Sequence, residues 1–253
     1  SADMKGRLNN HRVQPFDFAK GKDAALESIF EAIDEQIDFL RHDENLEPVR
    51  IGVVASGLVD ENAGVSISFP RFDDWQKVPL SEIIYSRYKI RADLAHHIVA
   101  TTLAEATFGT FKDTMNGVYI HLGPGLGAGI VINGDVIRGS KATIGEFGHV
   151  TVDESGPLCY CGNIGCLETV ASDFALVSQA EQAIRDGVQT HIPEHVDESG
   201  KITPLAVFRA AEMGDRYAAT ILEKSGGYLG RALANLINLL APEVVVFGGT
   251  MAE

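Results

Sequence analysis

The sequence predicts an α/β fold with mixed sheets, because segments with helical periodicity alternate with short apolar segments typical of strands. Apolar residues recur at helical spacing over residues 22–41, which indicates an amphipathic helix. Residues 49–55 form a nearly continuous apolar run, typical of a buried parallel strand. The pair Asn133-Gly134, directly after a strand-like stretch, predicts a two-residue hairpin turn.

The other elements follow the same patterns along the chain. Residues 56–75 are rich in turn-forming residues, and we expect no regular element there. The remaining expected helices cover 79–88, 97–108, 172–186, 204–213 and 216–240, the last weakened at Gly226-Gly227. The remaining expected strands cover 89–92, 117–122, 128–132 and 243–247.

Composition limits both location and partners. The chain of 253 residues contains no run of eighteen apolar residues and no signal-peptide pattern at its start, so we expect a cytoplasmic protein without a membrane partner. A net charge of −14 argues against this segment binding a phosphate backbone by itself. A glycine-dense region begins at Gly117, and we expect a lobe boundary near Gly109, with an N-terminal α/β lobe over 1–109 and a C-terminal α/β lobe over 110–253.

All three cysteines lie close to one histidine, in the pattern His149-x9-Cys159-x-Cys161-x4-Cys166. Three thiolates and one imidazole are the ligand set of a closed, tetrahedral zinc site. The alternative is three reduced thiols on a glycine-rich loop, in a chain with too few cysteines for a disulfide scaffold. The spacing favours structural Zn²⁺ held by His149, Cys159, Cys161 and Cys166.

The residues around this pattern resemble a family signature. Gly145-Glu-Phe-Gly-His149, the three cysteines and Gly165-Cys-Leu-Glu168 are together similar to the signature of the ROK family (repressors, open reading frames and sugar kinases). The resemblance covers nearly the whole chain. It implies a two-lobed actin-like (ribonuclease-H-like) α/β ATPase fold with a sugar cleft between the lobes, and a sequence that contains only part of each lobe.

The resemblance also implies roles for individual residues. His149 and the three cysteines take its zinc positions, and the sugar-contacting positions fall on Glu146, His149, Glu168 and, in a sugar-side loop, Gly57. Vestigial nucleotide loops are implied at Gly123, Gly125, Gly127, Gly248 and Gly249. Taken alone, each glutamate would be a solvated surface carboxylate, and glycines of this kind would serve tight packing.

The sequence departs from the kinases of the family at the catalytic base. Those kinases carry an Asn-Asp pair whose aspartate accepts the proton of the attacking sugar hydroxyl, and the matching position here is His97, preceded by His96. The two histidines either contact the sugar or form a polar pair at a helix start. Pro124 removes an N–H from the implied phosphate loop, and no Asp-x-Gly-Gly-Thr loop is present. We therefore expect no catalytic residue.

Three hypotheses follow. The first is a catalytically inactive, zinc-stabilised effector domain of a sugar-responsive ROK transcriptional regulator, which binds a sugar or sugar phosphate. Its DNA contacts would come from a winged helix-turn-helix outside this sequence, in a homodimer or homotetramer. The second is an ATP-dependent sugar kinase with His97 or Asp93 as a divergent base. The third is a degenerate fold that serves only as an oligomerisation scaffold.

Overall fold

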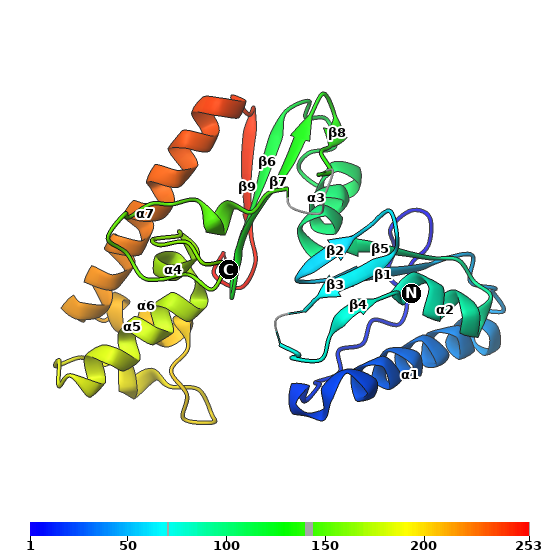
Figure 1. Ribbon diagram of the computed structural model, residues 1–253, viewed down its shortest axis with the longest axis horizontal. Helices are drawn as coiled ribbons and strands as arrows, with labels where there is room; N and C mark the ends of the chain where they lie inside the picture. The colour runs from blue at the N-terminus through cyan, green and yellow to red at the C-terminus, as the bar shows by residue number, and fades with distance from the viewer. Residues whose placement is uncertain (70, 140–143, 253) are drawn as a thin grey trace. The chain divides into compact units, whose positions relative to one another are not determined.

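Figure 1 shows a computed structural model of the chain, which describes residues 1–69, 71–139 and 144–252. These residues divide into two compact units, both with helices and strands. Unit 1 contains Ser1–Ala104 and the segment that begins at Arg138, and unit 2 contains Glu105–Ile137 and the chain from Ile144 onward. Within the described residues, no helix has the length and apolar character required to cross a bilayer.

Unit 1 combines one parallel and one antiparallel sheet with two complete α-helices and most of a third. Strand β1 pairs in parallel with β5, so that Ala55 lies opposite His96, and β2, β3 and β4 form an antiparallel sheet. Its elements are η1 (Phe18–Lys20), α1 (Gly21–His42), β1 (Ile51–Ala55), β2 (Leu58–Asp60), β3 (Val65–Ser68), β4 (Gln76–Val78), α2 (Leu80–Tyr88), β5 (Ala92–His96) and α3 (His97–Phe108), whose last residues belong to unit 2.

Three expectations for this unit were wrong. Residues 56–75 contain the strands β2 and β3, where we expected turns alone. The strand expected over 89–92 begins only at Ala92, because Lys89 adopts a left-handed conformation (φ 57°) that ends α2 and redirects the chain. Strand β1 is parallel as expected but is not buried throughout, since its Val54 is 58% exposed.

Unit 2 is built on a four-stranded sheet with the order β8-β7-β6-β9, in which β9 runs parallel to β6 (Figure 1). The hairpin turn predicted at Asn133-Gly134 is confirmed, with positive φ at both residues, and it joins β7 to β8. The elements are β6 (Gly117–Leu122), β7 (Leu126–Ile132), β8 (Asp135–Val136), η2 (Phe147–His149), α4 (Glu168–Ala171), α5 (Asp173–Arg185), η3 (Ile192–His195), α6 (Pro204–Glu212), α7 (Arg216–Leu240) and β9 (Val244–Gly248).

The long helix α7 connects two apolar clusters of this unit. Its C-terminal half packs Tyr228 and Ala232 against the sheet residues Val118 and Ile120, while its N-terminal half contacts α5 and α6 through Ile221. Helix α7 therefore packs against and stabilises the sheet whose turns and loops carry the candidate site.

Helix α7 is continuous through Gly226-Gly227, where we expected a weak point. Gly226 is exposed, and a methyl group there would meet no atom within 4 Å. We expect Gly226→Ala to raise the free energy of unfolding by about 0.5–1 kcal/mol, because alanine has the better helix propensity. Urea unfolding measures this. Gly214→Ala is the matched control, since that glycine also borders open space but has a φ of +94°, and it should be destabilising. A shift of the same sign in both variants would contradict the prediction.

Candidate metal centre and sugar-contact residues

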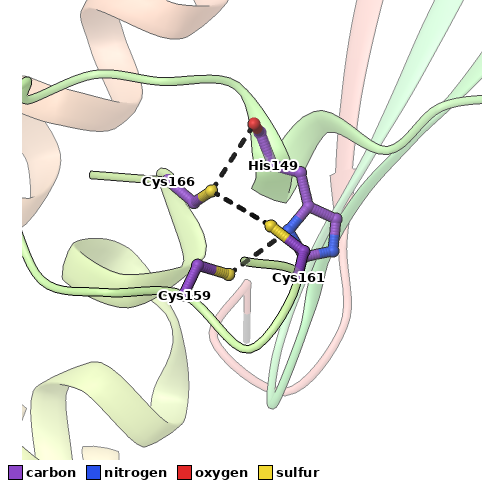
Figure 2. Close-up of side chains that lie close together, drawn as sticks. All are labelled: His149, Cys159, Cys161 and Cys166. Carbon is purple, nitrogen blue, oxygen red and sulfur yellow. Dashed lines mark hydrogen bonds between the residues drawn. The ribbon is translucent and has the colours of Figure 1, made fainter. Parts of the chain in front are cut away.

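The structure brings the four predicted metal ligands together. The Nδ1 or Nε2 atom of His149 and the Sγ atoms of Cys159, Cys161 and Cys166 all lie within 4.8 Å of one another. Figure 2 shows the four side chains directed toward a common centre. Cys159 and Cys166 are buried, whereas Cys161 is exposed. The cluster therefore sits at the surface of unit 2 with its base in the protein.

Two isolated β-bridges hold the loop of residues 151–166, which carries the three cysteines, in this shape. Thr151 pairs with Cys166, and Leu158 pairs with Ile164, in two isolated antiparallel bridges. Between the cysteines, the Cys159 N–H donates to the Asn163 carbonyl at 2.7 Å. These contacts fold the segment back on itself, so that three cysteines separated by two to seven positions present their sulfur atoms to the same point.

Two of the distances in the cluster are those expected around a tetrahedral metal ion. Cys159 Sγ lies 3.5 Å from His149 Nδ1, and Cys161 Sγ lies 3.7 Å from Cys166 Sγ. Zinc bonds of normal length in a regular tetrahedron place sulfur about 3.8 Å from sulfur and about 3.6 Å from nitrogen. The donor set could thus hold one metal ion and is consistent with zinc.

Burial and local hydrogen bonds act in opposite directions on two of the thiols. Burial raises the pKa of Cys166 to about 12, with the neighbouring thiols adding to the effect. The backbone N–H of Asn163 lowers the pKa of Cys161 below its usual range. A bound cation would compensate for the burial of the Cys166 thiolate, so metal binding and thiol deprotonation are coupled at this cluster.

The His149 ring links the metal cluster to a carboxylate. Its Nδ1 faces Cys159, while its Nε2 lies 3.7 Å from Glu146 Oε2 and 3.1 Å from the Tyr160 hydroxyl. Burial raises the pKa of Glu146, and His149 partly opposes this shift. Tyr160 was missed by the sequence analysis, although its position between two metal ligands was a usable signal.

Glu168 is fixed against the turn between β6 and β7. It opens α4, and its Oε2 accepts a hydrogen bond from the Leu126 N–H at 3.1 Å. A methyl group on Gly125 or on Gly148 would lie 3.1 Å from the same oxygen. Glycine at both positions leaves room for this carboxylate, and at Gly148 it also leaves room for the Leu126 carbonyl.

The other predicted sugar contacts lie in unit 1. His96 ends β5 and His97 begins α3, with their ring centroids 4.5 Å apart. Gly57, between β1 and β2, has a φ of +81° that favours glycine. Asp93, the alternative base, lies within β5 and is paired with Arg50 and Arg91. Its carboxylate is therefore engaged by two guanidinium groups.

The glycines of the implied nucleotide loops are closely packed. A methyl group on Gly123 would lie 3.1 Å from Thr250 Oγ1, and one on Gly248 or Gly249 would overlap Tyr119 or the Leu122 carbonyl. Gly127 does not lie in a loop as expected, because it pairs with His121 inside the β6–β7 ladder. Asp173 links the β6–β7 turn to the chain after β9. Its carboxylate accepts a hydrogen bond from the Thr250 hydroxyl at 2.8 Å, and its N–H donates to the Gly123 carbonyl.

Comparison with known proteins identifies the family. The family model described as "ROK family" matches residues 7–253. The chain belongs to the ROK family. Its ROK relatives include the DNA-binding transcriptional dual regulator NagC of Escherichia coli, 33% identical over 232 residues, which are 91% of this chain and 54% of NagC. The xylose repressor of Caldicellulosiruptor bescii is 34% identical over 78% of this chain and 49% of its own length. The chain thus spans about half the length of these two ROK repressors.

Solved ROK structures confirm the predicted actin-like fold. A ROK family transcriptional regulator, described as a homolog of the E. coli MLC protein, superposes with a TM-score of 0.78 at 35% identity, over 90% of this chain and 56% of that one. A ROK glucokinase from Streptomyces griseus, in complex with glucose and AMPPNP, gives a TM-score of 0.79 at 28% identity, over 99% and 78% of the two chains. Regulators and kinases of the family share this fold, so the fold does not distinguish a regulator from a kinase. That distinction has to come from the residues of the site.

Proposed function

We propose that this chain is the effector-binding part of a cytoplasmic ROK-type transcriptional regulator, which senses a sugar or sugar phosphate without phosphorylating it. The observation that carries the proposal is the substitution of the kinase base by His97, in a chain 33% identical to NagC over 91% of its length. A winged helix-turn-helix outside the sequence would contact DNA, and the regulator would be a homodimer or homotetramer. Sugar binding would then bias a conformational equilibrium that DNA binding also senses.

We propose Zn²⁺ as the metal of the His149–cysteine cluster, with a structural role. When bound, it would supply folding free energy to the loop and fix the His149 ring through Nδ1. The Nε2 atom then stays available for a hydrogen bond on the side of Glu146 and Tyr160. The donor set of one imidazole and three thiols, gathered within 4.8 Å, supports this assignment.

Glu146, His149 and Glu168 are proposed as the sugar contacts of unit 2. Carboxylates accept strong hydrogen bonds from sugar hydroxyls, and one imidazole nitrogen can donate or accept. The proximity of Glu146 and His149, and the fixed position of Glu168, support this role. We propose sugar contact also for Gly57, His96 and His97.

Titration calorimetry on the zinc-loaded protein tests the proposal. The panel contains glucose, xylose, N-acetylglucosamine and N-acetylglucosamine 6-phosphate, together with sorbitol as a non-ring control. We expect saturable 1:1 binding of at least one sugar. The absence of binding across the panel would overturn the sensing role and favour an oligomerisation scaffold.

A sugar kinase is the second candidate function. A glucokinase of Halalkalibacterium halodurans is 31% identical over 227 residues, which are 89% of this chain and 68% of that protein. A kinase reaction here would need His97 or Asp93 as the base, and Asp93 is paired with Arg50. ATP would be its cofactor, with Gly123 and Gly125 near its phosphates and Gly248 and Gly249 near its adenosine.

Replacing Glu168 by glutamine should weaken binding of the recognised sugar by about tenfold, because a neutral amide accepts a weaker hydrogen bond than a carboxylate. The metal content should stay unchanged, since Glu168 is not a ligand. Calorimetry and metal analysis on one preparation measure both quantities. Glu181→Gln, which removes an exposed charge paired with Arg185 in α5, is the matched control. An affinity equal to that of the unaltered protein would remove Glu168 from the site.

A further inference from the structure

One carboxylate in unit 1 joins the histidine pair to a distant segment of the chain. Glu61 lies in the turn between β2 and β3 with a side chain that is 16% exposed. Its Oε1 accepts the backbone N–H of His96 at 2.9 Å, and its Oε2 accepts the guanidinium of Arg138 at 2.9 Å. We propose that Glu61 is a positioning residue for sugar recognition, which holds the His96–His97 junction and is itself held by Arg138. This inference rests on the proposed function.

The junction is a place where one hydrogen bond controls two side chains. Strand β5 ends at His96 and helix α3 starts at His97, so no loop residue separates them. The His96 N–H lies directly before the first turn of α3, where a negative group is favoured by the helix dipole. Fixing this peptide group sets the direction in which both imidazoles leave the backbone.

The turn that carries Glu61 is itself well anchored. Asp60 Oδ1 accepts the Ala63 N–H at 3.0 Å, and the carbonyl of Gly64 accepts the Ser81 N–H at 3.1 Å. Val59, two residues before Glu61, is fully buried. Glu61 therefore presents its carboxylate from a rigid support, which is the requirement for positioning another group.

Arg138 holds this carboxylate from a part of unit 1 that is distant in the sequence. It follows β8, whose hairpin ends with the Ile137 N–H donating to the Ile130 carbonyl. The Glu61 carboxylate is mostly buried, whereas Arg138 is 55% exposed and reaches it from the solvent side. Loss of this guanidinium should leave the carboxylate less firmly oriented and so loosen the histidine junction that it holds.

The experiment compares Glu61→Gln, Glu61→Leu and Arg138→Gln with the unaltered protein. The first measurement is amide hydrogen exchange at His96 by NMR, which needs no ligand. The second is calorimetric affinity for whichever panel sugar the unaltered protein binds. Melting temperature and zinc content verify that each variant is folded. Glu47→Leu is the matched control, since it removes an exposed glutamate paired with Arg41 in the same unit.

We expect exchange at His96 to be at least about tenfold faster in Glu61→Leu, with sugar affinity lowered by about tenfold, because a charge-assisted hydrogen bond is lost. Glu61→Gln keeps an acceptor oxygen and should fall between Glu61→Leu and the unaltered protein in both measurements. Arg138→Gln should lower affinity while Glu47→Leu changes neither quantity.

The other possible outcomes each contradict the inference for a different reason. Unchanged exchange at His96 in both Glu61 variants would overturn the positioning role, whether or not a sugar binds. Faster exchange with unchanged affinity would show that the junction does not contribute to sugar recognition, and would also overturn it. If the unaltered protein binds none of the sugars, the proposed function fails first, and the inference falls with it.

Discussion

Replacing Cys166 by serine should abolish stoichiometric metal binding and unfold the loop that follows His149. Cys166 is fully buried, and its sulfur lies 3.7 Å from that of Cys161. Serine has nearly the same shape but does not provide a thiolate, so the tetrahedron loses one of its four ligands. Structural zinc contributes about 10–16 kcal/mol of apparent binding free energy in small zinc domains. Its loss should therefore be among the largest effects of any single substitution in this chain.

Metal analysis and thermal unfolding measure this result. We expect one metal ion per chain in the unaltered protein, none in Cys166→Ser, and a melting temperature lower by ten degrees or more, on the order of several kcal/mol for a domain of this size. Leu158→Ala is the control, because it alters an exposed side chain of the same loop without removing a ligand. Retention of metal by Cys166→Ser, or equal melting temperatures with and without a strong chelator, would contradict the structural role.

Replacing Gly145 by alanine should destabilise unit 2 by about 3 kcal/mol or more, the sum of left-handed strain and overpacking. Gly145 has a φ of +76°, and a methyl group there would overlap the Ala128 carbonyl oxygen. The same glycine accepts the Ala128 N–H at 2.8 Å, so the two backbones cannot separate without losing this bond. Because Glu146 comes next in the chain, sugar affinity should fall as well.

Gly187→Ala separates strain from overlap. Gly187 has the same φ of +76°, but a methyl group there would border open space. It should cost only about 1–2 kcal/mol, the usual penalty for a left-handed alanine. Urea unfolding of the two variants gives the difference. Equal destabilisation would mean that the close approach of Gly145 to β7 has no energetic importance.

Elements with strong local signals were predictable from the sequence. Helix α1 shows a clear apolar face, and Asn133-Gly134 adopts the positive φ values that its hairpin turn requires. The strands β2 and β3 were missed because each has only three or four residues, and because their polar side chains form hydrogen bonds with residues outside the strand. Ser66, for example, is buried because its hydroxyl accepts the Trp75 Nε1–H at 2.8 Å.

The same distinction applies to the site. The metal cluster was predictable because its four ligands lie within eighteen residues and follow a ligand pattern of their own. Glu61 and Arg138 were not, because their partners are a backbone N–H 35 residues away and a carboxylate 77 residues away. A hydrogen bond between a side chain and a main-chain group leaves no pattern in the sequence at the residue that supplies the main-chain group.

Mass spectrometry of a sugar incubated with this protein, zinc and Mg-ATP tests the central claim most directly. The sugar is the one that calorimetry shows to bind, and the incubation lasts for many hours at high protein concentration. We predict that the sugar is recovered without an added phosphoryl group. Formation of the sugar phosphate, lost in His97→Ala, would contradict the account and establish a kinase instead.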